Sequence, residues 1–207
     1  GKPVFVKSGN IAPANYFGDN KFYAVNTMQP PYQPSGNAPV DTSGNDALYA
    51  NTTKSTTLPA QTATHIGDLL SAKGVSWKWY AGSWNAATND GTQDPATTRS
   101  VIYAGNSYGV ATTANVDFQP HHQPFNYFSK YAPGTQAREQ HLKDGEDFLS
   151  DVQAGKLPAV SFYKPAGRDT QHPSYTDIVT GDVHISDVLE KLRNSPQWSR
   201  MLVIVTY

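Results

Sequence analysis

The chain of 207 residues contains no cysteine. This absence excludes disulfide bonds, zinc sites built on cysteine and catalysis by a thiol. It does not by itself decide the redox compartment. The chain also begins Gly1-Lys2-Pro3-Val4, without a methionine and without a recognisable signal peptide, so we expect a processed or partial chain.

Charge is also scarce. Only 16% of the residues are charged and the formal net charge is −1, with no basic stripe, so we expect no nucleic-acid partner. No apolar run approaches the roughly 20 residues that a transmembrane helix needs. Aliphatic residues are few and 12% of the chain is aromatic, so the core must rely on Trp, Tyr and Phe.

Residues 1–63 are rich in Gly, Pro, Asn, Ser and Thr, and only 22–27 resembles a strand. So long an irregular stretch is unusual inside a compact domain. We therefore predict a loop-rich excursion at 1–63 over a core at 64–207, the two forming one domain that is incomplete at both ends.

Regular structure is predicted from residue 64 onward by hydrophobic periodicity. Helices are expected from about 64 to 73, at 136–142, at 146–154 and around 185–192, the last beginning at Ser186 or just before it. Strands are expected at 75–80, 100–104, 159–163 and 201–207. This order predicts an α/β fold with a mostly parallel sheet and helices on both faces, in which ligands bind beyond the carboxyl ends of the strands.

Two histidines lie between two Gln-Pro pairs, in Gln119-Pro120-His121-His122-Gln123-Pro124. The prolines predict a stiff, non-helical segment, and the aromatic residues after it predict that the segment is held against a core with both imidazoles pointing outward. Gln171-His172-Pro173 repeats the pattern. Imidazoles suit phosphate binding, proton transfer and metal ligation. A proline-rich surface loop with incidental histidines explains the local pattern about as well.

Several other charged residues could have either a structural or a functional role. Asp144, Glu146 and Asp147 fit the start of a helix better than a site. Lys164 and Arg168 follow a predicted strand and would suit an anion, although solvated surface is the favoured reading.

The remaining histidines are expected in structural or solvated places. His65 and His184 lie where helices are predicted to start. His141 is expected on the solvated face of a helix. Gly105-Asn106-Ser107-Tyr108-Gly109 matches the G-x-S-x-G elbow of serine esterases, but the residues after it do not look helical.

Several stretches, in the same order, resemble the bacterial phosphoesterase family of acid phosphatases and phospholipases C. They are 22–35 (FYAVNTMQPPYQPS), 66–70 (IGDLL), 74–80 (GVSWKWY), 118–127 (FQPHHQPFNY), 141–145 (HLKDG), 155–165 (GKLPAVSFYKP), 171–173 (QHP) and 195–198 (SPQW). The acid-phosphatase branch is the more similar.

The resemblance implies an internal part of an alkaline-phosphatase-like catalytic domain. It implies hydrolysis of a small phosphate ester or a phospholipid headgroup by a Ser or Thr nucleophile beside a divalent metal ion. His121, His122 and His172 match family histidines around the phosphate. The nucleophile and the metal ligands are expected upstream of Gly1 and just after Tyr207, on remaining segments of the same polypeptide. A periplasmic or secreted location is also implied.

Two alternatives stay open. In the first, the isolated chain is an aromatic-rich fragment with a binding or structural role and no catalytic activity. In the second, which is less favoured, it is a serine esterase that uses Ser107.

Overall fold

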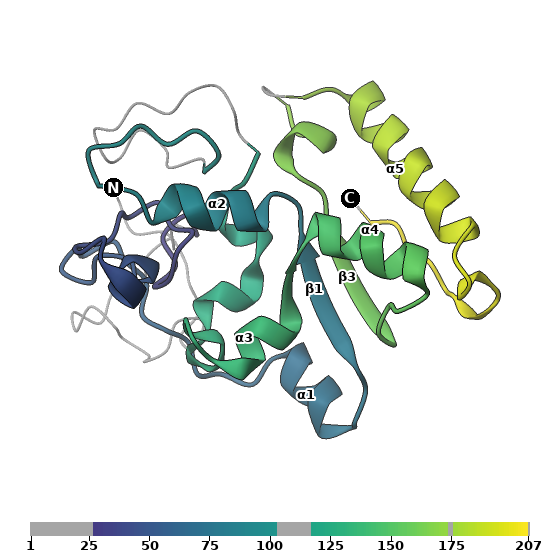
Figure 1. Cartoon of the computed structure of the whole chain (residues 1–207), viewed down its shortest axis with the longest axis horizontal. Coiled ribbons are helices and arrows are strands. Elements are labelled where there is room, and N and C mark those ends of the chain that lie inside the picture. Colours follow the sequence, from purple (N-terminus) through teal and green to yellow (C-terminus); the bar gives the residue numbers. More distant parts are fainter. Residues whose placement is uncertain (1–26, 103–116, 174–175, 207) are drawn as a thin grey trace, which may run out of the picture.

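The structure is a computed structural model that describes residues 27–102, 117–173 and 176–206 (Figure 1). The strands are β1 (Trp77–Ala81), β2 (Leu142–Asp144) and β3 (Val160–Lys164). The α-helices are α1 (Ile66–Ala72), α2 (Trp84–Gly91), α3 (Gln136–His141), α4 (Gly145–Ala154) and α5 (Ile178–Arg193). Short 3₁₀ helices are η1 (Gly44–Leu48), η3 (Pro120–His122), η4 (Pro124–Tyr127), η5 (Ser129–Tyr131), η6 (Gly167–Asp169) and η7 (Trp198–Arg200).

The described part of the sheet is small and entirely parallel, in the order β2-β1-β3. Tyr80 of β1 faces Lys143 of β2 on one side and Tyr163 of β3 on the other. The predicted α/β class with a parallel sheet is therefore confirmed. The sequence reading missed β2, because three residues between two helices are too few to show a period.

Both faces of the sheet are covered, because successive side chains of β1 point to opposite faces. Trp77 points into a cluster with Phe125, Tyr131 and Leu142, to which α1, α2 and α3 also contribute. Tyr80 points to the other face, where it meets Phe148 of α4 and Leu192 of α5. Figure 1 shows α4 crossing the sheet beside β3, with α5 beyond it. Aromatic rings supply much of both clusters, as the composition predicts.

Residues 27–63 contain little regular structure, yet much of this segment is buried, including 29–37. Its backbone groups are satisfied by isolated backbone hydrogen bonds, such as Gln33 N to Leu48 O at 2.8 Å, and by polar side chains. Gln33 Nε2 donates to Asn37 O at 2.8 Å, and Asn126 Nδ2 donates to Tyr32 O at 2.9 Å. Arg138 of α3 donates to Gln33 O at 2.8 Å, which ties the segment to the core. The domain boundary at residue 63 stays a prediction.

Helix α5 begins earlier than the sequence predicts. Asp177 caps it by accepting from Thr180 N at 2.8 Å, about two turns before Ser186. The first turns of α5 were not predicted from the sequence. Their apolar residues, Ile178, Val179 and Val183, are exposed and do not form a stripe that faces the core.

The strand predicted at 201–207 is wrong for the described residues 201–206, which form no strand. Leu202 is 85% exposed and Ile204 73% exposed. A β-branched apolar run forms a strand only where a neighbouring strand pairs with it, and no described segment does so here. At 100–104 the described part holds only an isolated bridge between Ile102 and Phe118, and residues 103–104 lie outside the described ranges.

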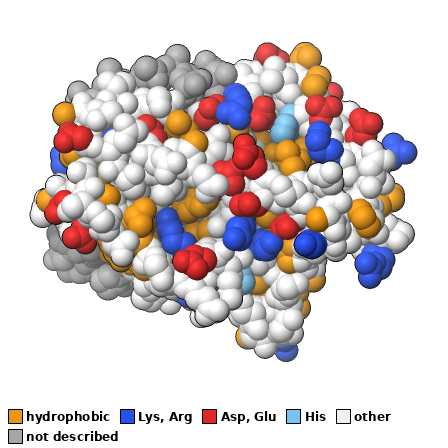
Figure 2. Space-filling view, viewed as in Figure 1, with side chains coloured by type: hydrophobic (Ala, Val, Ile, Leu, Met, Phe, Trp, Pro, Cys, Tyr) orange, Lys and Arg blue, Asp and Glu red, His pale blue; other side chains and the backbone are white. Residues whose placement is uncertain are grey.

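The described surface is mixed in charge. Figure 2 shows acidic and basic side chains interspersed on one face of the molecule, in keeping with the absence of a basic stripe from the sequence. No described helix combines the length and the apolar character that crossing a membrane requires.

Gly82 generates a prediction about the connection after β1. A Cβ on Gly82 would lie 2.2 Å from Ala166 N, a backbone atom beyond the end of β3. We expect Gly82→Ala to lower the free energy of unfolding by roughly 3 kcal/mol or more, since the two backbones must separate. Urea denaturation of the parent and the variant measures this difference in unfolding free energy.

Gly44→Ala is the matched control, because Gly44 has a positive φ of 55° but nothing within 4 Å of its Cβ position. It should cost only about 1 kcal/mol. Equal losses in the two variants would contradict the packing explanation for Gly82.

Candidate functional site

The carboxyl ends of the three described strands meet at one edge of the sheet, at Ala81, Asp144 and Lys164. This follows from the parallel pairing, because parallel strands all end on the same side. Gly82 N donates to Lys164 O at 2.8 Å and so closes the gap between β1 and β3. The segments that carry the histidines come to this edge.

The His121-His122 pair is part of η3, with Pro120 at its first helical position. The prediction of a non-helical segment is corrected to this short 3₁₀ turn, whose first residue suits the fixed φ of proline. Trp79 Nε1 of β1 donates to His122 O at 2.8 Å. A strand residue therefore holds the histidine pair, which agrees with the prediction that the segment is pinned against a core.

The two imidazoles differ in environment. His121 is exposed, whereas His122 is only 5% exposed, so the expectation that both point outward is wrong for His122. Their ring centroids are 5.1 Å apart. His122 Nδ1 is buried without a hydrogen-bond partner among the described residues, while His121 Nδ1 lies 3.5 Å from Thr27 Oγ1.

His172 reaches the same region through contacts between distant segments. Gly167 N donates to Asp117 O at 2.6 Å, and Arg168 donates to the Asp117 carboxylate at 2.7 Å. Asp117 immediately precedes the segment of the histidine pair, so the loop after β3 is tied to that segment. His172 itself is exposed, and its Nδ1 donates to Pro173 O at 2.6 Å.

Burial and positive neighbours govern the protonation of this cluster. Burial, and after it the charges of Lys164, His121 and His172, together lower the pKa of His122 to about 3. The pKa of His121 is also lowered, first by burial and then by Lys164 and His172. His122 is therefore neutral near pH 7, and each neutral imidazole offers one donor and one acceptor.

Lys164 belongs to this cluster, although the sequence favoured solvated surface for it. The residue is half-buried at the end of β3, and burial lowers the pKa of its ammonium. Its position at the carboxyl end of a predicted strand was the available signal. Arg168 is exposed and already paired with Asp117.

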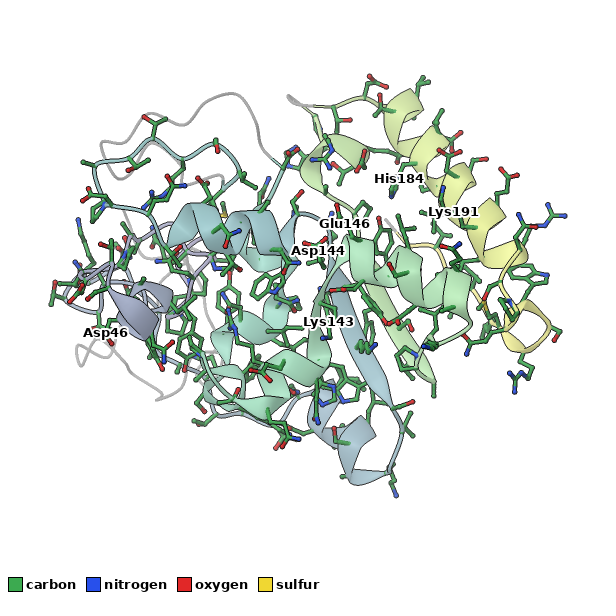
Figure 3. The ribbon with its side chains drawn as sticks, viewed as in Figure 1. Asp46, Lys143, Asp144, Glu146, His184 and Lys191 are labelled. Atoms are coloured by element: carbon green, nitrogen blue, oxygen red, sulfur yellow. The ribbon has the colours of Figure 1, made fainter. Side chains whose placement is uncertain are left out.

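The acidic residues at the start of α4 have the capping role that the sequence favoured. Asp144 accepts from Glu146 N at 3.0 Å and from Asn85 N at 2.8 Å, and Asp147 accepts from Asp144 N at 3.0 Å. Figure 3 shows Asp144 and Glu146 where α4 begins. Across the described ranges, no group of three or more His, Asp or Glu side chains is placed to hold a metal ion.

The other histidines have structural places. His65 caps α1 as the sequence indicated, accepting from Asp68 N at 3.3 Å. His141 is not solvated as predicted, because its ring stacks on Trp77 with centroids 4.0 Å apart. His184 lies within α5 rather than at its start and is 3.0 Å from the Tyr163 hydroxyl. Ser107 and its proposed elbow lie outside the described residues.

The sequence profile of the Phosphoesterase family matches residues 9–207, almost the whole chain. The chain belongs to the phosphoesterase family. The roles of His121, His122 and His172 in that family's chemistry remain a prediction that this membership does not test.

Three plant proteins are similar to a part of this phosphoesterase chain. Non-specific phospholipase C6 of Arabidopsis thaliana is 36% identical over 67 residues, 29% of this chain and 13% of the relative. Non-specific phospholipase C1 of the same plant is 38% identical over 69 residues, 29% of this chain and 12% of the relative. Non-specific phospholipase C4 is 38% identical over 72 residues, 30% of this chain and 13% of the relative. The similarity thus covers about an eighth of each relative's length.

The buried neutral His122 predicts a specific sensitivity to acid. Its folded pKa of about 3 lies below the ordinary 6.5, so the unfolded chain binds more protons between these values and stability falls as the pH falls through that window. Between pH 6.5 and about pH 4 we expect this residue alone to cost on the order of 3 kcal/mol of unfolding free energy.

Urea denaturation at a series of pH values measures this loss, with His122→Gln as the comparison because the amide does not titrate. The variant should lose less stability on acidification than the parent. Identical pH dependence of the two proteins would contradict the assignment of a neutral buried imidazole.

Proposed function

We propose that this protein hydrolyses phosphate esters, with His121, His122 and His172 binding the phosphoryl group. The observation that supports the proposal most is the convergence of these residues with Lys164 at the carboxyl edge of a parallel sheet, in a chain of the phosphoesterase family. Such edges are where α/β folds bind ligands. The imidazole N–H donors of the cluster and the positive charge of Lys164 suit an anion with several acceptor oxygens.

In the proposed reaction, an oxygen nucleophile forms a bond to phosphorus while the bond to the leaving oxygen breaks. A neutral imidazole donates its N–H to a non-bridging oxygen, where negative charge is held through the transition state. His172, whose Nδ1 donates to Pro173 O, is proposed to carry a proton to the leaving oxygen. His121 is the other exposed imidazole placed for proton transfer.

The nucleophile and a divalent metal ion are proposed from the family resemblance, with a Ser or Thr and metal ligands on segments outside these 207 residues. The described residues themselves do not form a metal site. The metal, when bound, would polarise phosphoryl oxygens. The alkaline-phosphatase-like domain and an exported location belong to the same proposal.

The substrate class is proposed as a small phosphate ester or a phospholipid headgroup. The three plant relatives are phospholipases C by name, which supports the headgroup, whereas the longer stretches of resemblance point to acid phosphatases. Both have a phosphoryl group that the histidines would bind.

The experiment is hydrolysis of a chromogenic phosphate monoester and of a phosphodiester, with and without added divalent metal. We expect metal-dependent turnover from polypeptide that carries the flanking segments, and none from the 207 residues alone. His121→Ala, His122→Ala and His172→Ala should each lower kcat/KM by roughly a hundredfold, the usual contribution of an acid–base group.

His184→Gln is the control, since His184 lies on α5 against Tyr163 and is expected to leave kcat/KM within about a factor of two. Turnover by the 207 residues alone would place the nucleophile inside them, and Ser107 would be substituted first. Phosphate binding without turnover, even with the flanking segments, would favour the non-catalytic binding module instead.

A further inference from the structure

Lys164 is a half-buried lysine that has no acidic partner in the described part of the chain. Its ammonium forms no hydrogen bond or ion pair with any residue that the structure describes. Other lysines differ: Lys78 lies 2.6 Å from the Asp151 carboxylate, and Lys130 lies 2.5 Å from that of Asp68. An unpaired cation withdrawn from water costs folding free energy.

The strand geometry places Lys164 on the face of the sheet that holds the histidine pair. Successive strand residues point to opposite faces, so Lys164 shares a face with Phe162. The Phe162 ring stacks on Trp79 with centroids 5.2 Å apart, and Trp79 Nε1 donates to His122 O. Tyr163, between them, faces the other way and stacks on Phe148 at 4.4 Å.

The charges around Lys164 leave the region short of anions. The charge of Lys164 lowers the pKa of both His121 and His122, so all three lie within electrostatic reach of one another. Arg168, the nearest cation in sequence, is bound to Asp117 and contacts Asp169 at 3.8 Å. Among the described residues, Lys164 is therefore the cation of this cluster that has no counter-charge.

We propose that the Lys164 ammonium binds the phosphoryl oxygens of the ligand together with His121 and His122. This inference deepens the proposed function and rests on it. Lys164 then supplies the fixed positive charge that a neutral His122 cannot, and the bound anion compensates the cost of burying an unpaired ammonium. The shared chemistry is a phosphoryl group, whether in free phosphate, a monoester or a lipid headgroup.

The first test is binding of inorganic phosphate to the 207-residue chain by calorimetry, for the parent and for Lys164→Met. We expect the variant to bind phosphate about tenfold to a hundredfold more weakly, as when one charged hydrogen bond is lost. Its unfolding free energy should stay equal or rise, because an unpaired half-buried charge has been removed. A residue with a merely structural role would instead lose stability.

Lys156→Met is the matched control. Lys156 is exposed and precedes β3, at the opposite end of that strand from Lys164, so phosphate affinity should not change. Lys164→Gln serves as a second variant that keeps a polar side chain, and it should lose affinity like Lys164→Met. Retained affinity in both Lys164 variants, or a parent that does not bind phosphate, would overturn the proposal, as would a loss of stability in both variants.

Two soluble probes distinguish the ligand source. Phenyl phosphate presents a monoester and glycerophosphocholine presents the diester of a lipid headgroup. If Lys164→Met weakens the affinity for either probe, the result supports the role of Lys164. If the affinity does not change, the result counts against that role. Because binding is measured without turnover, the two proposals can fail separately. Phosphate binding through Lys164, in a protein that stays inactive even with its flanking segments and added metal, would refute the proposed hydrolysis and leave this inference standing.

Discussion

The parallel pairing of β1 on both of its edges is the constraint on which the rest of the structure depends. It brings three strand ends to one edge and sends Trp77 and Tyr80 into different clusters. Trp79 then uses its indole N–H to hold the segment of the histidine pair. A single strand therefore builds the core on both faces and positions the candidate site, so damage to β1 affects stability and site together.

Polar side chains satisfy many of the buried backbone groups of this chain that a sheet ladder would satisfy in another protein. Residues 29–37 are almost entirely buried without regular structure, which is tolerable only because the backbone groups find partners. Arg138 is central to this: it donates to Gln33 O, Tyr131 O and Asn126 Oδ1, and its guanidinium lies over Trp84. Burial lowers the pKa of Arg138 to about 10, so it remains charged at neutral pH.

The candidate site is built with an excess of positive and neutral nitrogen groups. Two carboxylates of the connected segments have other partners: Asp117 binds Arg168, and Asp144 caps α4. An anion would stabilise an arrangement of this kind, and the proposed phosphoryl ligand would supply that anion. His122 Nδ1 is likewise buried and finds no hydrogen-bond partner among the described residues.

The sequence by itself determined the α/β class, the strand β1 and the helices α1, α3 and α4, and it pointed to the proline-flanked histidines as candidates. These depend on local propensities and on periods that are visible along the chain. Only the tertiary structure decided which groups meet. It buried His122 but not His121, stacked His141 on Trp77, brought Lys164 into the cluster and left residues 202–205 exposed. Each of these outcomes depends on a partner far away in sequence, and a pattern in one segment carries no information about what packs against it.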